Sequence, residues 1–255
     1  MIVFDDVHKA FGDRQVLDGL SLTIPDGDTT VIIGYSGTGK SVALKHIVGL
    51  LQPDAGQVLV DGRPVPEMDR SELTALRGTI GYVFQFAALF DSMTVAENIR
   101  MGLRRRALDP SAIEARVAES LALVDLSGSE ARHPAELSGG MRKRVGLARA
   151  IALRPRYILY DEPTTGLDPV TAAVIDQLMV RTREELGVTG VVVTHDMRSC
   201  YTVGDRIAML YEGRIRQVGT VDEIRATTDP VVRQFIEGRP GQPEAEEAAM
   251  PSRAR

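Results

Sequence analysis

Residues 34–41 decide how this chain folds, and they read Gly34-Tyr35-Ser36-Gly37-Thr38-Gly39-Lys40-Ser41. The stretch fits G-x-x-x-x-G-K-[ST], the pattern of a phosphate-binding loop. A hydrophobic run over residues 29–33 leads into it, and apolar residues at a helical spacing follow it from Val42 onward. A glycine-rich turn is the alternative, but a strand before and a helix after are the context that a phosphate loop requires.

The residue types in this loop suit the binding of a phosphate chain. Glycines let the backbone wrap closely around phosphates, with its N–H groups pointing inward. The helix that follows presents its positive N-terminal end to the same anion. We expect Lys40 to reach the β- and γ-phosphates of a nucleotide, and the Ser41 hydroxyl to bind Mg²⁺.

The composition is ordinary for a globular protein of one large domain or two small ones. The 255 residues are 44% hydrophobic and 25% charged, and the net charge of −5 argues against a general nucleic-acid binder. No apolar run approaches a membrane span, and the first residues lack the features of a signal peptide, so we expect a cytosolic chain. Cys200 is the only cysteine, which excludes an internal disulfide and predicts a small buried residue.

The remaining patterns predict an α/β fold with a helical insertion. Residues 1–33 contain short apolar or alternating runs separated by turn signals, one of them at residues 18–19. The pattern turns helical over about residues 86–153, with the clearest helices at 95–103 and 111–123. From residue 238 onward the chain is rich in Pro, Glu and Ala, which favours a disordered or loosely docked tail.

Polar residues follow two buried strands at the end where ligands bind in open parallel sheets. Asp161 and Glu162 end the apolar strand 157–162, and phosphate-loop enzymes hold Mg²⁺ with an acid at such a place. Glu162 then lies where a base or a water-orienting group is needed. His195 follows the strand 190–194 in the same way, although a lone histidine is more often structural.

Three further candidates are more ambiguous when they are considered alone. Phe11 is either a core residue or an aromatic ring that stacks on a nucleobase. Gln85, at the end of a predicted strand, is either a solvated residue or a ligand for Mg²⁺ or for the attacking water. Ser138, followed by Gly139 and Gly140, caps a predicted helix that runs to about residue 153. That helix start is either an ordinary cap or a second anion site, and local physics leaves the two open.

Taken in order, these motifs resemble the ATP-binding cassette of ABC transporters over residues 1 to about 225. The resemblance implies a P-loop NTPase (RecA-like) core, with an N-terminal antiparallel β subdomain and an inserted α-helical signature subdomain at about 86–153. It implies a cassette over residues 1–237 and a tail over 238–255. The implied nucleotide contacts are Phe11, Gly34, Tyr35, Ser36, Gly37, Thr38, Gly39, Lys40, Ser41, Val42, Gln85, Ser138, Gly139, Gly140 and Asp168. The implied Mg²⁺ ligands are Ser41, Gln85 and Asp161, and the implied catalytic residues are Glu162 and His195.

The resemblance also implies how the protein works. Two cassettes pair head to tail with two ATP molecules at the joint, and Ser138 touches the γ-phosphate held by the partner. Glu162 acts as general base toward water, and His195 holds the γ-phosphate in line. The segment 85–90 receives a membrane permease, which is a separate subunit. The implied location is the cytoplasmic face of the inner (cell) membrane.

The subfamily resemblance rests on the run Met141-Arg142-Lys143-Arg144, together with Phe84-Gln85 and residues 88–90. These are similar to the MlaF group, the ATPases of Mla/Mce-type phospholipid transporters, whereas Tyr35 and residues 86–87 depart from that group. The implied partners are a multi-span permease, an Mce-domain protein and sometimes a STAS-domain protein, with no nucleic acid. The alternatives are a cassette for another solute, a non-transport ATPase acting on DNA or ribosomes, and a regulator without turnover.

Overall fold

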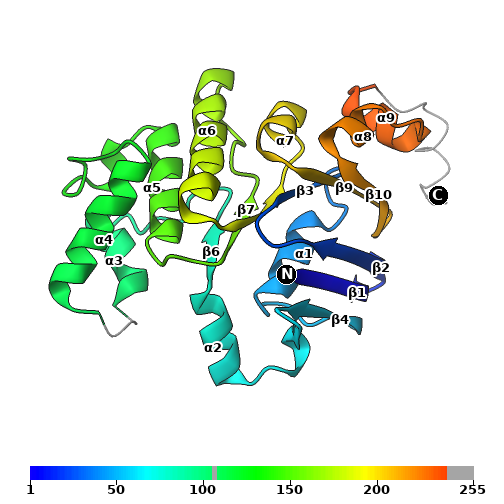
Figure 1. Ribbon diagram of the computed structural model, residues 1–255, viewed down its shortest axis with the longest axis horizontal. Helices are drawn as coiled ribbons and strands as arrows, with labels where there is room; N and C mark the ends of the chain where they lie inside the picture. Colours follow the sequence, from blue (N-terminus) through cyan, green and yellow to red (C-terminus); the bar gives the residue numbers. More distant parts are fainter. Residues whose placement is uncertain (105–107, 240–255) are drawn as a thin grey trace, which may run out of the picture.

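The computed structural model describes residues 1–104 and 108–239 (Figure 1). Most of the predicted tail, residues 240–255, lies outside these ranges. Within them, none of the helices combines the length and the apolar character that crossing a bilayer takes. Cys200 is fully buried, as predicted.

The N-terminal part forms a four-stranded antiparallel sheet in the order β2-β1-β4-β5. The turn predicted at residues 18–19 is wrong, because β2 runs through it. Val7 pairs with Leu20 and His8 with Asp18, so Gly19 is an extra residue that bulges out of the ladder. The strands are β1 (Ile2–Phe11), β2 (Arg14–Ile24), β4 (Ala55–Val60) and β5 (Arg63–Pro64).

A second, six-stranded sheet forms the centre of the molecule, in the order β10-β9-β3-β8-β7-β6. Strands β9, β3, β8, β7 and β6 are parallel, and β10 is antiparallel to β9. Ile32 packs into one buried cluster, while Val31 and Ile33 pack into another, so both faces of this sheet are covered. The strands are β3 (Thr29–Ile33), β6 (Ile80–Val83), β7 (Tyr157–Asp161), β8 (Thr189–Val193), β9 (Arg206–Tyr211) and β10 (Arg214–Thr220).

Helix α1 lies between the two sheets, and α5 packs against β6 of the central sheet while α3 and α4 pack on α5. Leu44 and Ile47 of α1 share a buried cluster with Phe4 of β1 and Ile32 of β3. Figure 1 shows α3, α4 and α5 gathered on the side away from the antiparallel sheet. The helices are α1 (Lys40–Ile47), α2 (Arg70–Gly78), α3 (Val95–Leu103), α4 (Pro110–Leu123), α5 (Gly139–Ile151), α6 (Pro169–Leu186), α7 (Met197–Val203), α8 (Val221–Arg225) and α9 (Pro230–Ile236), with short 3-10 turns at Val65–Glu67 and Pro134–Glu136.

The predicted fold class is confirmed by this arrangement. The helices predicted at 95–103 and 111–123 are α3 and α4. Helix α3 begins where Thr94 accepts a hydrogen bond from the Glu97 N–H while the Glu97 carboxylate accepts one from the Thr94 N–H, which is a capping box. The bounds of the helical subdomain, 86–153, and of the whole cassette, 1–237, remain predictions.

Candidate functional site

The candidate residues follow adjacent parallel strands of the central sheet. In the strand order, β3 is followed by β8, β7 and β6. The phosphate loop follows β3, His195 follows β8, Asp161 and Glu162 stand at the end of β7, and Gln85 follows β6. Because the carboxyl ends of parallel strands share one edge, residues far apart in the sequence meet along it.

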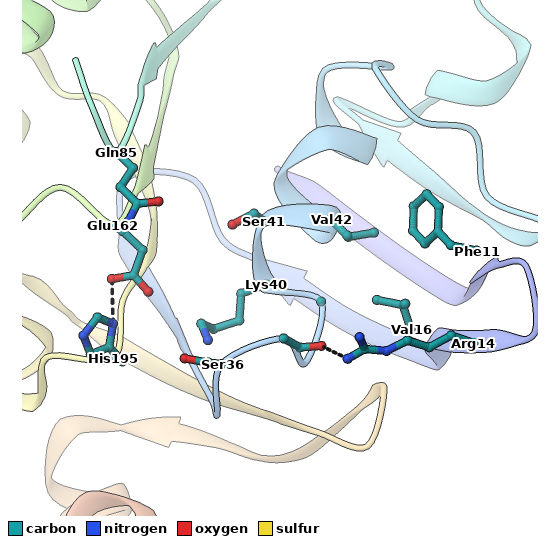
Figure 2. Close-up of a pocket in the computed structure, with 12 residues that line it drawn as sticks. Phe11, Arg14, Val16, Ser36, Lys40, Ser41, Val42, Gln85, Glu162 and His195 are labelled. Atoms are coloured by element: carbon teal, nitrogen blue, oxygen red, sulfur yellow. Dashed lines mark hydrogen bonds and ion pairs between the residues drawn. The ribbon is translucent and has the colours of Figure 1, made fainter. Parts of the chain in front are cut away.

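A cavity of about 440 Å³ opens at this edge. Figure 2 shows Gln85, Glu162 and His195 on one side of the cavity, with Phe11 on the other and Lys40 between them. The ring of Phe11 is 48% exposed, so it is not a core residue. The full lining is Phe11, Arg14, Val16, Ser36, Gly37, Gly39, Lys40, Ser41, Val42, Gln85, Glu162 and His195.

Lys40 is a buried cation that is held by the loop itself. It is only 7% exposed, and its Nζ donates to the carbonyl oxygens of Gly34 at 2.7 Å and Tyr35 at 2.9 Å. Burial lowers the pKa of the ammonium, and the nearby charges of Glu162 and Asp161 oppose that shift. No carboxylate in the described part of the chain forms an ion pair with Lys40, so its charge remains available for an anion.

Two glycines of the loop are required by the space around them. A Cβ atom on Gly34 would overlap the carbonyl oxygen of Leu210 on β9. Gly39 has a φ of +103°, and a Cβ there would lie 2.8 Å from Val16 Cγ1. Gly39 is also the N-cap of α1, without a side-chain cap, so the first N–H groups of that helix face the loop. The loop thus offers backbone donors and a helix N-terminus beside Lys40.

Ser41 and Asp161 form an oxygen-rich pair at the inner end of the loop. The Ser41 hydroxyl donates to Asp161 Oδ1 at 2.7 Å, and the Tyr82 hydroxyl donates to Asp161 Oδ2 at 3.1 Å. Within residues 1–104 and 108–239, no group of three or more His, Cys, Asp or Glu side chains gathers to hold a metal by itself. One carboxylate and one hydroxyl match the way Mg²⁺ binds, since that ion takes few protein ligands and completes its shell with phosphates and water.

Glu162 and His195 lie side by side at the wall of the cavity, with their side chains in contact. Glu162 Oε2 lies 2.9 Å from His195 Nδ1 and accepts a hydrogen bond from the Thr165 hydroxyl at 3.1 Å. The Glu162 side chain is 13% exposed and that of His195 is 59% exposed. The carboxylate is therefore held in place, whereas the imidazole reaches toward the open side.

The backbone at Glu162 is fixed in an unusual conformation. Its φ is +50°, in the left-handed region, and its N–H donates to the carbonyl oxygen of Val193 on β8 at 2.9 Å. The buried Nζ of Lys143, on α5, donates to the carbonyl oxygens of Gln85 and, at 3.3 Å, of Glu162. Burial lowers the pKa of Lys143. This lysine ties α5 to the segments after β6 and β7.

Several predicted contact residues lie outside the cavity. Among the residues that the structure describes, the lining omits Gly34, Tyr35, Thr38, Asp161, Ser138, Gly139, Gly140 and Asp168. Ser138 caps α5, as predicted, by accepting a hydrogen bond from the Met141 N–H at 3.3 Å. Asp168 caps α6 by accepting from the N–H groups of Val170 and Thr171, both at 3.0 Å.

The sequence analysis missed five residues that shape the site. Arg14 and Val16 line the cavity, and Arg14 Nη2 donates to the Gly37 carbonyl oxygen at 3.0 Å (Figure 2). Tyr82, Thr165 and Lys143 hold Asp161, Glu162 and the neighbouring backbone. Of these five residues, only Lys143 could have been found from the local sequence. It lies in the helix that begins at the signature motif, and helical spacing places it on the side of that helix that faces the core.

Known proteins show which family this chain belongs to. The sequence pattern of the ABC transporter family matches residues 17–165. Over 93% of its length the chain is 42% identical to the probable ribonucleotide transport ATP-binding protein mkl of Mycobacterium bovis, of which it covers 67%. Over 91% it is 41% identical to the intermembrane phospholipid transport system ATP-binding protein MlaF of Escherichia coli K12, of which it covers 87%.

A solved structure matches with similar completeness. It is a dimeric post-hydrolysis state of an ATP-binding cassette bound to ADP and Pi, with a TM-score of 0.79 and 35% sequence identity, and it covers 87% of this chain and 99% of that chain. Fold and site define a P-loop ATPase. The chain belongs to the ABC transporter family, as an ATP-binding cassette with ATPase activity. Cassettes of this family bind ATP or ADP, form dimers and work with membrane permease components.

Proposed function

We propose that the cavity of Figure 2 is the ATP site of this cassette and that hydrolysis there drives phospholipid through a separate permease. One observation carries the site assignment. A single cavity joins an exposed aromatic ring, Phe11, to a buried unpaired cation, Lys40, and to the Glu162–His195 pair. A nucleoside triphosphate has an aromatic base, a phosphate chain and a reacting terminal phosphate in that order.

In this proposal, different walls of the cavity bind different parts of the nucleotide. Phe11 stacks on the adenine, and Val16 and Arg14 flank it from the same side. The backbone of residues 34–41, the start of α1 at Val42 and the Lys40 ammonium hold the phosphates. Because Lys40 already sits 2.7 Å and 2.9 Å from two loop carbonyls, it is prepositioned, and little ordering is left to do on binding.

The oxygen atoms of Ser41 and Asp161 fit Mg²⁺, and Gln85 lines the same cavity as Ser41. Ser41 and Asp161 would hold the ion, which would supply positive charge against the charge that develops on the phosphates. The hydroxyl of Tyr82 keeps the Asp161 carboxylate oriented toward that position.

The residues of the reacting end act on the water and on the terminal phosphate. Glu162 accepts the proton of the attacking water, and Thr165 and His195 fix the orientation of its carboxylate. The exposed His195 holds the γ-phosphate in line. Positioning and charge stabilisation supply most of the rate in reactions of this kind.

A second copy of the chain completes the site in this proposal. Ser138, Gly139, Gly140 and Asp168 line no part of the cavity among the described residues, although Ser138 and Gly139 are exposed at the start of α5. That arrangement supports a contact with the ATP of a partner cassette. The dimeric state of the similar cassette with ADP and Pi supports it as well.

The cargo is the part of the proposal that depends most on relatives. Similarity to MlaF, together with residues 141–144, favours phospholipid, whereas the name of mkl favours a ribonucleotide at nearly the same identity. With phospholipid as cargo, the partners are a multi-span permease and Mce-domain and STAS-domain proteins, without nucleic acid. The site of action is then the cytoplasmic face of the inner membrane.

Purification of the chain from solubilised membranes tests this assignment. We expect a multi-span permease, an Mce-domain protein and bound phospholipid to co-purify, and ATP hydrolysis in the complex to rise with added phospholipid. A permease that carries a ribonucleotide, with no response to phospholipid, would replace the cargo and leave the ATP site standing. Recovery with ribosomes or DNA and without any membrane protein would contradict the transport assignment.

A further inference from the structure

The side chain of Tyr35, the second residue of the phosphate loop, contacts the C-terminal helix α9 and the end of β9. The centre of its ring lies 5.1 Å from that of Phe235 on α9, with the ring planes at 85°, and 6.3 Å from that of Tyr211 on β9, at 63°. Both geometries are edge-to-face, which is favourable for aromatic pairs. Three rings therefore connect the phosphate loop to the last helix that the structure describes.

The backbone of Tyr35 meanwhile closes the loop around the candidate phosphate site. Its carbonyl oxygen accepts hydrogen bonds from Lys40 Nζ and from the Thr38 hydroxyl, each at 2.9 Å. The preceding residue, Gly34, is wedged against the Leu210 carbonyl, one residue before Tyr211. Because Tyr35 is anchored by its ring on one side and organises Lys40 on the other, a shift of the ring moves the carbonyl that positions the ammonium.

We propose that Phe235 and Tyr211 are positioning residues that act through Tyr35. The position of α9 then determines the affinity of the loop for nucleotide. The proposal rests on the assignment of the ATP site made above. Its physical basis is preorganisation, since a loop held in its binding shape loses less conformational freedom when the phosphates arrive. Linkage makes the effect reciprocal, so a factor that displaces α9 weakens nucleotide binding, and bound nucleotide steadies α9.

Helix α9 is anchored independently of these rings. Val232 is fully buried, and Asp229 caps the helix by accepting from the N–H groups of Val231 and Val232 at 3.0 Å and 3.1 Å. Asp229 also pairs with Arg216 on β10 at 2.9 Å. Removal of the Phe235 ring is therefore expected to leave the helix in place, which makes the contact testable by substitution.

The test is a titration of the full chain with a fluorescent ATP analogue, alongside steady-state ATPase kinetics. For Phe235→Ala and Tyr35→Ala we expect the dissociation constant to rise about threefold to tenfold, the size of one or two aromatic contacts. We expect KM to rise in parallel while kcat at saturating ATP changes less than about twofold, because the chemistry at Glu162 is not touched.

Ile236→Ala is the matched control, since Ile236 is the next residue on α9, is partly buried against the core and carries no ring. We expect it to lower thermal stability but not nucleotide affinity. The double variant of Tyr35 and Phe235 should bind no more weakly than the weaker single variant, because both remove one contact. Wild-type affinity in Phe235→Ala, equal weakening in Ile236→Ala, or additive effects in the double variant would each overturn the proposal.

A Lys40→Ala sample separates this inference from the site assignment. If Lys40→Ala binds the analogue as well as the wild type does, the assigned ATP site is wrong and the proposal falls with it. If Lys40→Ala loses binding while Phe235→Ala retains it, only the role of α9 is wrong.

Discussion

The two candidate anion-binding motifs of this chain differ in what surrounds them. The phosphate loop leads into α1, which has no side-chain cap, and beside it a buried ammonium and a cavity of about 440 Å³ are already in place. The signature motif leads into α5, where the Ser138 hydroxyl caps the helix and no described residue of the motif lines that cavity. The phosphate loop is the enclosed motif, because other parts of the chain line the cavity beside it, and the signature motif is an exposed edge.

This difference shows that two helix N-termini with similar sequences can differ in what they need in order to bind an anion. At α1 the chain supplies the cation, the metal-binding oxygens and the Glu162–His195 pair that a triphosphate needs. At α5 it supplies backbone donors and one hydroxyl, while the buried Lys143 of that helix donates to the carbonyl oxygens of Gln85 and Glu162. A ligand at α5 must therefore be brought there by another surface, and the proposed second copy brings ATP in its own phosphate loop.

The largest effect is expected from Glu162→Gln, which breaks the chemistry of the enclosed motif. The amide cannot accept the proton of the attacking water, so the ATP hydrolysis rate should fall by about 10²-fold to 10⁴-fold. Binding of ATP should persist, because Glu162 holds no phosphate in the proposal. Hydrolysis at the wild-type rate, measured as phosphate release, would show that Glu162 is not the base.

Lys40→Ala should have the next largest effect, on binding rather than on chemistry. The loss of a buried cation that faces the phosphates is expected to weaken ATP binding by roughly 100-fold or more. Lys45→Ala is the matched control, because Lys45 lies on the same helix and is exposed. Calorimetric titration of both variants checks the prediction, and equal affinities for the two would contradict it.

Some parts of the site could be predicted from the sequence and others could not, and the reason is physical. The phosphate loop and the acids after β7 are contiguous patterns, so their spacing carries their meaning. The Lys143 bond to the Gln85 carbonyl joins residues 58 apart in the sequence, and the ring of Tyr35 meets Phe235 across the whole chain. Such contacts depend on packing that no local pattern encodes.

The strand β2 illustrates a second kind of failure. Asp18-Gly19 has the composition of a turn, and it was predicted as one. In the fold, Gly19 has a φ of +86° and is accommodated as a bulge, because the apolar residues on both sides pair with the same strand, β1. Pairing over the full length of β2 outweighed the local preference for a turn.

A smaller effect, on stability, should distinguish two buried or capping carboxylates that lie near the two motifs. Asp176 on α6 is buried and accepts a hydrogen bond from the Ser199 hydroxyl at 2.9 Å, behind the segment that carries His195. Burial raises the pKa of this carboxyl to about 6, from 3.8. The folded chain keeps the proton between these values while the unfolded chain loses it, so this group costs stability as pH rises from about 4 to 6.

Asp176→Asn should therefore raise the free energy of unfolding at pH 8 by about 1–3 kcal/mol, and change it little at pH 4. Asp168, which caps α6 near the signature motif, should change stability with pH in the opposite direction. Hydrogen bonds from Thr171 lower the pKa of Asp168, so the stabilisation that this carboxylate contributes to the fold is lost as pH falls. Urea unfolding at both pH values, with the exposed Asp13→Asn as control, checks the sign. A gain at pH 4 equal to that at pH 8 would contradict the titration of Asp176.

The claim that the enclosed motif and the exposed edge meet across two chains is tested most directly by cross-linking. One sample carries Ser36→Cys and another carries Ser138→Cys, both exposed sites, in a Glu162→Gln background. The native Cys200 is fully buried, and burial raises its pKa to about 12, so it should not react.

The two samples are mixed and treated with a short bis-maleimide linker. We predict a covalent dimer that forms in the mixture with ATP and Mg²⁺, and that is weak or absent without nucleotide or in either sample alone. No covalent dimer in the mixture with ATP, or the same yield without nucleotide, would contradict the account.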